Sequence, residues 1–278
     1  MLNMKIDMSV DYEGMGFEKP EKQSTLTTYI LDNIEKEGTE WLKRPAVIIC
    51  PGGGYAHVSA REAEPVALKY TSAGFHAFLL DYSVAPYVGW PAPCCELAKA
   101  IAYVRSIADE YNIDKEKIIV CGFSAGGHLA GSAGVHYDNE DVKKFAGVNG
   151  VENKPNGMIL CYPVVTDDLE KTHMGTFNSF VRDREEVKKL FGLEHYVTKD
   201  TPKAFIWHTF EDKGVPVENS MKLASAFIEN KVNCELHIFP RGGHGLSLSN
   251  KQVCMLNGGI YPEIQPWVDM SIMWIDNL

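Results

Sequence analysis

The chain has 278 residues, of which 45% are hydrophobic and 23% charged, and its formal net charge is -10 at pH 7. The length suits one large α/β domain or two smaller ones. The acidic balance opposes binding to phosphate backbones and to anionic membrane surfaces, because no basic cluster offsets it locally. We therefore expect neither nucleic acid nor a membrane among its partners.

The beginning of the chain and the cysteines bear on the compartment. Residues 1–14, MLNMKIDMSVDYEG, do not combine a charged segment, an apolar segment and a small-residue cleavage site, so they do not resemble a secretory signal. No apolar run approaches the roughly 18 residues of a membrane-spanning helix. Most of the seven cysteines lie in strand-like runs, where cysteine acts as a small apolar residue. These features predict a cytoplasmic protein with free thiols and no metal site.

Strand-like and helix-like segments alternate along the chain. Two edge strands are expected within the first 44 residues, in KIDMSV and TLTTYILD. Buried strands are then predicted at 45–50, 76–82, 117–123, 157–163, 203–209 and 234–240, and the segments between them have apolar residues near helical spacing. A repeated strand, helix, strand order implies an α/β fold with a mostly parallel sheet and helices on both faces.

Residues 164–202 interrupt this alternation. They are polar, mainly helical in pattern and too long for a plain connection between a strand and the next, so we expect an inserted lid. No repeat, low-complexity tract or linker divides the rest of the chain. The sequence therefore predicts a single domain over residues 1–278 with a lid at 164–202.

A candidate nucleophile lies between a predicted strand and a predicted helix. Residues 122–126, GFSAG, match the pattern G-x-S-x-G in the context that this motif requires. Small residues on both sides of Ser124 permit a sharp turn, and the helix N-terminus then faces a developing negative charge. The pattern predicts Ser124 as a nucleophile; the alternative is a glycine-rich turn in which the serine has only a local role.

A nucleophile in this position is followed along the chain by an acid and then by a histidine. His244, in PRGGHGLSL, lies in a glycine-rich loop just after a predicted strand, where an imidazole can reach over the sheet edge. In the preceding loop, Asp212 comes before KGVP and the next helix, with Glu211 as the alternative acid. The order predicts a triad of Ser124, Asp212 and His244.

An oxyanion hole is expected after the first central strand. Residues 50–59, CPGGGYAHVS, contain three successive glycines whose backbone is free to turn N–H groups toward a ligand. The alternative is a flexible loop. The predicted donors are the N–H groups of Gly53, Gly54 and Ala125.

Five segments carry a resemblance to a known family: PGGGY (51–55), DYSVAP (81–86), GFSAGG (122–127), HTFEDKGVPVENS (208–220) and IFPRGGHGLSL (238–248). The chain resembles the α/β-hydrolase fold and, more narrowly, the esterase/lipase branch with hormone-sensitive-lipase-like enzymes and bacterial acetyl esterases that act on sugars and xylan. In the lipase branch the glycine run usually reads HGGG, whereas Pro51 takes the place of the histidine here. The resemblance implies two-step acyl transfer with no metal or organic cofactor.

The expected substrate is a short-chain ester, in particular an acetylated sugar. The charged insertion at 164–202 offers little apolar surface for long acyl chains. Four aromatic residues fall near loops expected at the mouth of the site, where their rings could pack against a sugar or, alternatively, serve ordinary packing: Tyr55, Tyr82, Trp90 and Tyr162. The alternatives are an arylformamidase, a small serine peptidase or a non-catalytic binding protein of the same fold, and a homodimer is compatible with the sequence.

Overall fold

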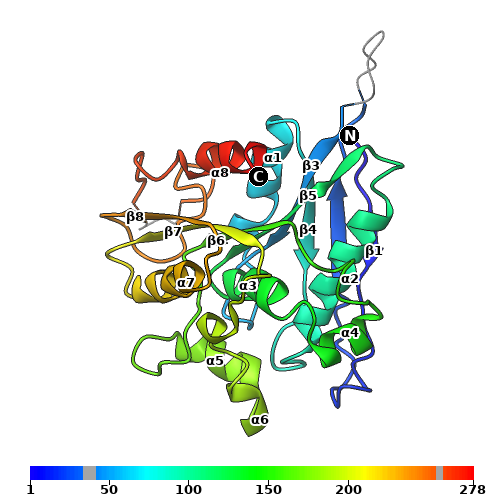
Figure 1. Cartoon of the computed structure of the whole chain (residues 1–278), viewed down its shortest axis with the longest axis vertical. Helices are drawn as coiled ribbons and strands as arrows, with labels where there is room; N and C mark the ends of the chain where they lie inside the picture. Colours follow the sequence, from blue (N-terminus) through cyan, green and yellow to red (C-terminus); the bar gives the residue numbers. More distant parts are fainter. Residues whose placement is uncertain (34–41, 255–258) are drawn as a thin grey trace.

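One sheet organises the chain in the computed structural model, which describes residues 1–33, 42–254 and 259–278. The strands follow the order β1-β2-β4-β3-β5-β6-β7-β8 across the sheet (Figure 1). The first two strands are antiparallel, and the others run parallel to one another. The bounds are β1 Lys5–Asp7, β2 Thr25–Tyr29, β3 Arg44–Cys50, β4 His76–Asp81, β5 Ile113–Phe123, β6 Gly157–Cys161, β7 Lys203–Thr209 and β8 Cys234–Phe239.

The strands predicted from apolar runs are confirmed, with one instructive difference in length. β5 begins at Ile113 rather than at Lys117. Ile113 is buried and pairs with Arg44 of β3 next to an irregularity in the register, and charged residues follow it. A search for apolar runs misses this extension, because the charged residues 114–117 separate the buried Ile113 from the apolar run that starts at Ile118.

Helices cover both faces of the sheet, as predicted. Helices α1 and α8 lie on one face, and α2, α3, α4 and α7 lie on the other (Figure 1). Because the central strands are buried between these layers, their side chains are apolar on both faces. The bounds are α1 Glu64–Ser72, α2 Ala92–Ser106, α3 Ala125–Val135, α4 Glu140–Ala146, α7 Glu218–Glu229 and α8 Trp267–Asp276.

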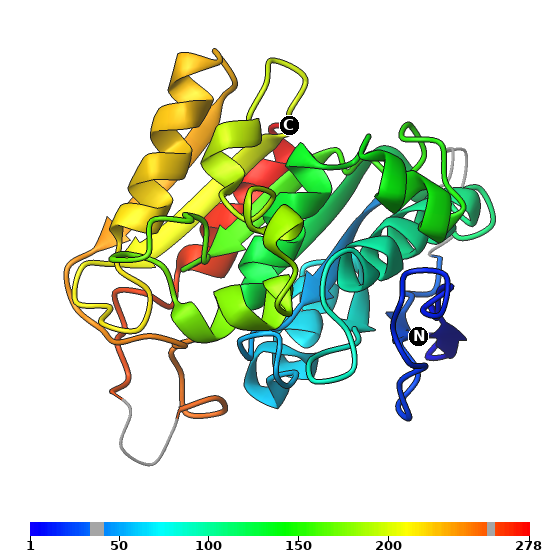
Figure 2. The ribbon, with the colours of Figure 1, turned by 90° about the horizontal axis from the view of Figure 1, so that it is seen from below.

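Residues 164–202 contain short helices between β6 and β7. They are α5 Met174–Val181, α6 Glu185–Lys188 and the 3-10 helix η2 Leu193–Tyr196. Figure 2 shows the N-terminal strands at one side of the molecule and α7 near the other, with the short helices between them in the view from below. The insertion therefore lies over the middle of the strand order, beside α3.

The parallel strands place several loops at one edge of the sheet. The carboxyl ends of β3, β5, β6, β7 and β8 meet there, since parallel strands point the same way. The residues that follow those ends are Pro51, Ser124, Tyr162, Phe210 and Pro240. The segments that carry the predicted site residues thus converge, although they are far apart along the chain.

Candidate active site

Ser124 occupies a sharp turn between β5 and α3. Its backbone has φ 55° and ψ -118°, a conformation that a non-glycine residue adopts only under constraint. A Cβ at Gly122 would lie 2.0 Å from the carbonyl oxygen of Gly126, and a Cβ at Gly126 would lie 2.1 Å from that of Cys50. The turn is therefore closed by backbone contacts that leave no room for a side chain at Gly122 or Gly126, two residues before and two after the serine.

The structure brings His244 between Ser124 and Asp212. Nε2 of His244 lies 2.7 Å from Oγ of Ser124, and Nδ1 lies 2.6 Å from Oδ2 of Asp212. Oδ1 of Asp212 accepts the backbone N–H groups of Gly214 and Val215, each at 2.9 Å. These bonds fix both oxygens of the carboxylate, so one faces the loop and the other faces the imidazole.

The alternative acid lies elsewhere. Oε2 of Glu211 accepts the N–H of Gly242 at 3.1 Å, and its side chain is exposed. Among the described contacts none joins Glu211 to His244. Of the two acids that the sequence left open, Asp212 is the one that contacts the imidazole.

A second histidine, which sequence reasoning did not connect to the site, also contacts Asp212. Nε2 of the fully buried His208 lies 3.3 Å from Oδ2 of Asp212 and 2.8 Å from the carbonyl oxygen of Val215. Its Nδ1 pairs with Oγ of Ser220 at 2.7 Å. Burial alone would raise the pKa of Asp212, but the hydrogen bonds from His208, His244 and the Val215 backbone hold it well below its usual value. The carboxylate therefore stays ionised beside the imidazole.

The glycine run forms a loop beside the serine. Gly53 and Gly54 have φ of 130° and 66°, in the region that favours glycine. Within the described residues, no group accepts the backbone N–H of Gly53, of Gly54 or of Ala125, the first residue of α3. Gly53 and Gly54 line the hollow beside Ser124, and Ala125 directly follows the serine, so these three unpaired donors near the nucleophile are suited to a negatively charged oxygen.

The four aromatic residues expected at the mouth lie beneath the site instead. Tyr55, Tyr82, Trp90 and Tyr162 are each at most 2% exposed. The hydroxyl of Tyr82 donates to the carbonyl of Pro51 at 2.6 Å, and that of Tyr55 pairs with Nδ1 of His128 at 3.0 Å. Such rings have no free face for a sugar, so we assign them a packing role that supports the loops.

A hollow of about 390 Å³ opens above Ser124. Its wall joins the glycine loop, the His244 loop and α5 of the insertion. The lining residues are Gly53, Gly54, Ala56, His57, Ser59, Arg61, Glu62, Ser124, His173, Gly175, Ser179, His244 and Gly245. Sequence reasoning missed Arg61, Glu62, His173 and Ser179 as parts of this wall, because they lie outside the segments that carry a motif. The side chains that surround the serine are thus small or polar.

His173 is the residue of the insertion that reaches this hollow with an imidazole. Its Nδ1 accepts the N–H of Thr176 at 3.1 Å and also contacts Oγ1 of Thr176 at 2.8 Å. Burial, followed by the charge of His244, lowers the pKa of His173. The neutral ring therefore carries its proton on Nε2, where it can donate to a ligand.

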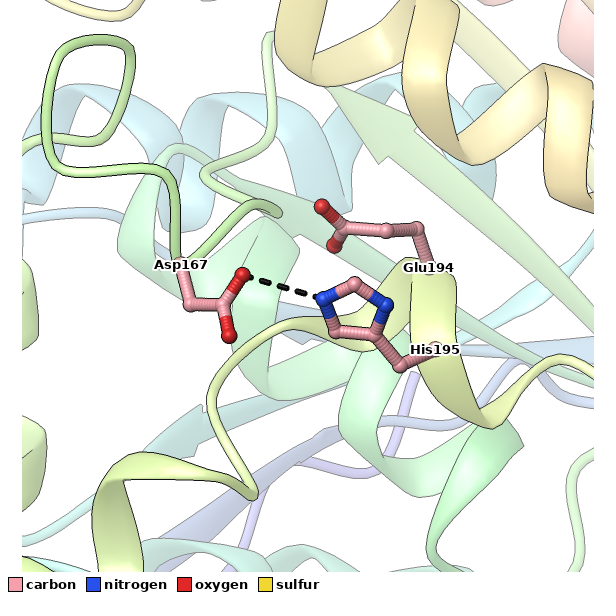
Figure 3. Close-up of side chains that lie close together, drawn as sticks. All are labelled: Asp167, Glu194 and His195. Atoms are coloured by element: carbon pink, nitrogen blue, oxygen red, sulfur yellow. Dashed lines mark hydrogen bonds and ion pairs between the residues drawn. The ribbon is translucent and has the colours of Figure 1, made fainter.

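One group of described side chains could hold a metal ion, and it lies apart from Ser124. Ligand atoms of Asp167, Glu194 and His195 lie within 4.8 Å of one another. Figure 3 shows the Asp167 carboxylate pointing toward the His195 ring, and Nε2 of the ring lies 3.0 Å from Oδ1. None of the three lines the hollow above the serine.

Among the described residues, every helix is too short or too polar to cross a membrane.

Comparisons with known proteins agree on the family. A model of the BD-FAE family matches residues 33–227. Endo-1,4-beta-xylanase B of Butyrivibrio fibrisolvens is 37% identical over 76% of this chain, and the match covers 34% of that protein. Acetylxylan esterase of Xylanibacter ruminicola is 29% identical over 72% of this chain and 40% of its own length. The chain therefore spans less than half the length of these two relatives.

Solved structures match the chain over nearly its whole length. The acetyl ester-xyloside bifunctional hydrolase of Caldicellulosiruptor lactoaceticus is 34% identical with a TM-score of 0.81, covering 99% of this chain and 96% of that one. The carboxylesterase Cest-2923 of Lactobacillus plantarum WCFS1 is 26% identical with a TM-score of 0.83, covering 100% and 98%. The chain belongs to the BD-FAE family, and its fold is that of the α/β hydrolases.

Proposed function

We propose that the chain removes short acyl groups, in particular acetyl, from carbohydrates and similar polar alcohols, with Ser124 as nucleophile. The observation that carries this proposal is the continuous series of hydrogen bonds from Ser124 Oγ through His244 to Asp212. The serine lies at a pocket that is also lined by Gly53 and Gly54, whose backbone N–H groups are unpaired within the described part of the chain. This combination is what two-step acyl transfer requires.

In the first step the Ser124 hydroxyl attacks the ester carbonyl while Nε2 of His244 takes its proton. Asp212 accepts a hydrogen bond from the Nδ1–H of His244 and so keeps Nε2 available as the base. The negative charge that develops on the carbonyl oxygen is held by the N–H groups of Gly53, Gly54 and Ala125. The C–O bond to the alcohol then breaks, and the imidazolium returns the proton to the departing oxygen.

In the second step water hydrolyses the acyl-enzyme. Nε2 of His244 takes a proton from the water as its oxygen attacks the acyl carbon, and the same N–H groups hold the second oxyanion. The bond to Ser124 Oγ breaks and His244 returns the proton to the serine. The products are the free carboxylic acid and the restored hydroxyl, and the cycle consumes one water.

The substrate class follows from the wall of the hollow. Among the described residues, its lining has no leucine, isoleucine, valine or phenylalanine. A long acyl chain that moved from water into the hollow would therefore find few apolar side chains to pack against. His57, Arg61 and His173 can instead donate hydrogen bonds to hydroxyl oxygens of the alcohol part. The acetylxylan esterase and the acetyl ester-xyloside hydrolase among the similar proteins support the same class.

The test is a substrate panel with Ser124→Ala as the background control. We expect 4-nitrophenyl acetate to have a higher kcat/KM than the octanoate, and acetylated xylo-oligosaccharides to release acetate. Peptide anilides and N-formylkynurenine, which probe the peptidase and arylformamidase alternatives, should turn over far more slowly. Preference for the octanoate, or no acetate release from any acetylated sugar, would overturn the substrate class without affecting the assignment of the nucleophile.

A further inference from the structure

Glu62 is a buried carboxylate that touches the oxyanion loop. It ends the 3-10 helix η1 Ala60–Glu62 and is 3% exposed. Its Oε2 accepts the backbone N–H of Gly52 at 2.8 Å, and its Oε1 accepts the hydroxyl of Tyr162 at 2.7 Å. Gly52 directly precedes Gly53 and Gly54, so the first of these bonds fixes the start of the loop that carries two proposed oxyanion donors.

The second bond extends the contact to the loop of His244. The hydroxyl of Tyr162 also accepts the N–H of Ser247 at 2.8 Å, and Oγ of Ser247 donates to the carbonyl of Arg61 at 2.7 Å. The Tyr162 ring lies 5.1 Å from the His244 ring in an edge-on arrangement. One carboxylate thereby joins the loops that follow β3, β6 and β8.

The approach of Glu62 to the loop depends on a glycine. A Cβ at Gly52 would lie 2.8 Å from Oε2 of Glu62 and 2.8 Å from the carbonyl oxygen of Phe123. Pro51 has no N–H, and its carbonyl is already taken by Tyr82 at 2.6 Å. The orientation of the peptide after Pro51 is therefore set from one side by Tyr82 and from the other by Glu62.

Glu62 reaches this position without an ion pair among the described residues. The neighbouring Arg61 donates instead to the carbonyl oxygens of Gly245 and Val253, at 2.9 and 3.0 Å. A buried carboxyl group without a cation is unfavourable unless its hydrogen bonds are made. Both oxygens of Glu62 make such bonds to the loops around Ser124, so replacing the carboxylate must disturb those loops.

We propose that Glu62 is a positioning residue of the esterase, which holds the Gly53 and Gly54 donors and the His244 loop in register through Gly52 and Tyr162. The proposal rests on the function proposed above. The transition state needs the donors aimed at the oxyanion, whereas binding of the neutral ester depends on them less. A disturbed loop should therefore lower kcat more than it raises KM.

The experiment compares Glu62→Gln with a matched substitution elsewhere. An amide has one acceptor and one donor group, so it can accept from Gly52 or from Tyr162 but not from both. We expect kcat for 4-nitrophenyl acetate to fall about 10-fold to 100-fold, less than the loss of a whole oxyanion donor, with KM nearly unchanged. The reaction of Ser124 with diisopropyl fluorophosphate should slow by a similar factor, since its transition state uses the same donors.

Glu96→Gln is the matched control. Glu96 is also fully buried and likewise accepts a tyrosine hydroxyl, Tyr12 at 2.7 Å, and a backbone N–H, Ser83 at 2.8 Å. It does not line the hollow above Ser124. Its substitution should leave kcat and KM unchanged, whatever its effect on the thermal midpoint. A kcat loss in Glu62→Gln that is absent in Glu96→Gln supports positioning rather than a general effect of altering a buried carboxyl.

Several outcomes would overturn the inference. Wild-type kcat in Glu62→Gln would do so, as would a loss confined to KM. If Glu62→Gln does not fold, Tyr162→Phe tests the same bridge by removing one oxygen atom, and an unchanged kcat there overturns it. Ser124→Ala is measured alongside: activity that survives in it contradicts the proposed function, whereas an inactive Ser124→Ala with a fully active Glu62→Gln contradicts this inference alone.

Discussion

Asp212→Asn changes one atom at a position where every polar contact is assigned. Oδ1 accepts two backbone N–H groups at 2.9 Å, and Oδ2 faces Nδ1 of His244 at 2.6 Å and Nε2 of His208 at 3.3 Å. An asparagine keeps both backbone bonds by placing its oxygen at the Oδ1 site. Its NH₂ group must then take the Oδ2 site, facing the two imidazoles.

The amide group can only donate there, so the proton of His244 must move from Nδ1 to Nε2. In this tautomer Nε2, which lies 2.7 Å from Oγ of Ser124, can no longer accept the serine proton. We expect kcat to fall about 10⁴-fold, because an imidazole in the wrong tautomer cannot act as the base. The loss should remain below that of Ser124→Ala, for which removal of the nucleophile costs about 10⁶-fold in kcat. Asp212 orients the base, whereas Ser124 reacts.

The assay is kcat for 4-nitrophenyl acetate, with thermal unfolding to show that the variant is folded. Glu211→Gln is the control, because Glu211 is exposed and its described side-chain bond goes to the N–H of Gly242. It should change kcat little. Asp212→Asn with activity within 10-fold of the wild type, or a larger loss in Glu211→Gln than in Asp212→Asn, would refute the assignment of the acid.

Three further predictions concern pH and packing. Because the base must be neutral, kcat/KM should fall on the acid side with a slope of one proton, and a flat profile between about pH 5 and about pH 8 would argue against His244. Gly126→Ala places a Cβ 2.1 Å from the carbonyl oxygen of Cys50, and should lower the free energy of unfolding by at least about 2 kcal/mol; an unchanged denaturant midpoint would contradict the close contact. Burial raises the pKa of Glu96 to about 7, so its contribution to stability is present below the ordinary carboxyl pKa and is lost as pH rises toward 7. The thermal midpoint of Glu96→Gln should therefore improve relative to the wild type over that window, and a constant difference would contradict the shift.

The fold and the order of the site residues could be predicted because their signals are local. Each role can be recognised from a few neighbouring residues: an apolar run of strand length, a serine between small residues, and a histidine in a glycine-rich loop. The order of the elements then brings Ser124, Asp212 and His244 to one edge of the sheet. No local signal supports the expected cytoplasmic location, single domain and homodimer, and these stay predictions.

The directions of loop side chains and the links between loops could not be predicted in the same way. Tyr55 and Tyr82 lie near the mouth in sequence, yet their rings point into the core, because a loop residue has no periodicity that tells its two sides apart. The contact of Glu62 with Tyr162 joins loops that follow β3 and β6, which lie on either side of β5 in the sheet, and the contact of His208 with Asp212 depends on the path of the loop after β7. Neither the strand order nor the path of that loop can be read from a local pattern of residues.

The proposed reaction depends on Ser124 as a nucleophile that His244 activates. The most direct test is the intact mass of the protein after exposure to diisopropyl fluorophosphate, followed by peptide mapping. We expect a single adduct on Ser124, no adduct in Ser124→Ala, and much slower labelling in His244→Ala because the hydroxyl then lacks its base. Absence of an adduct from the folded wild-type protein, or an adduct that persists in Ser124→Ala, would contradict the claim.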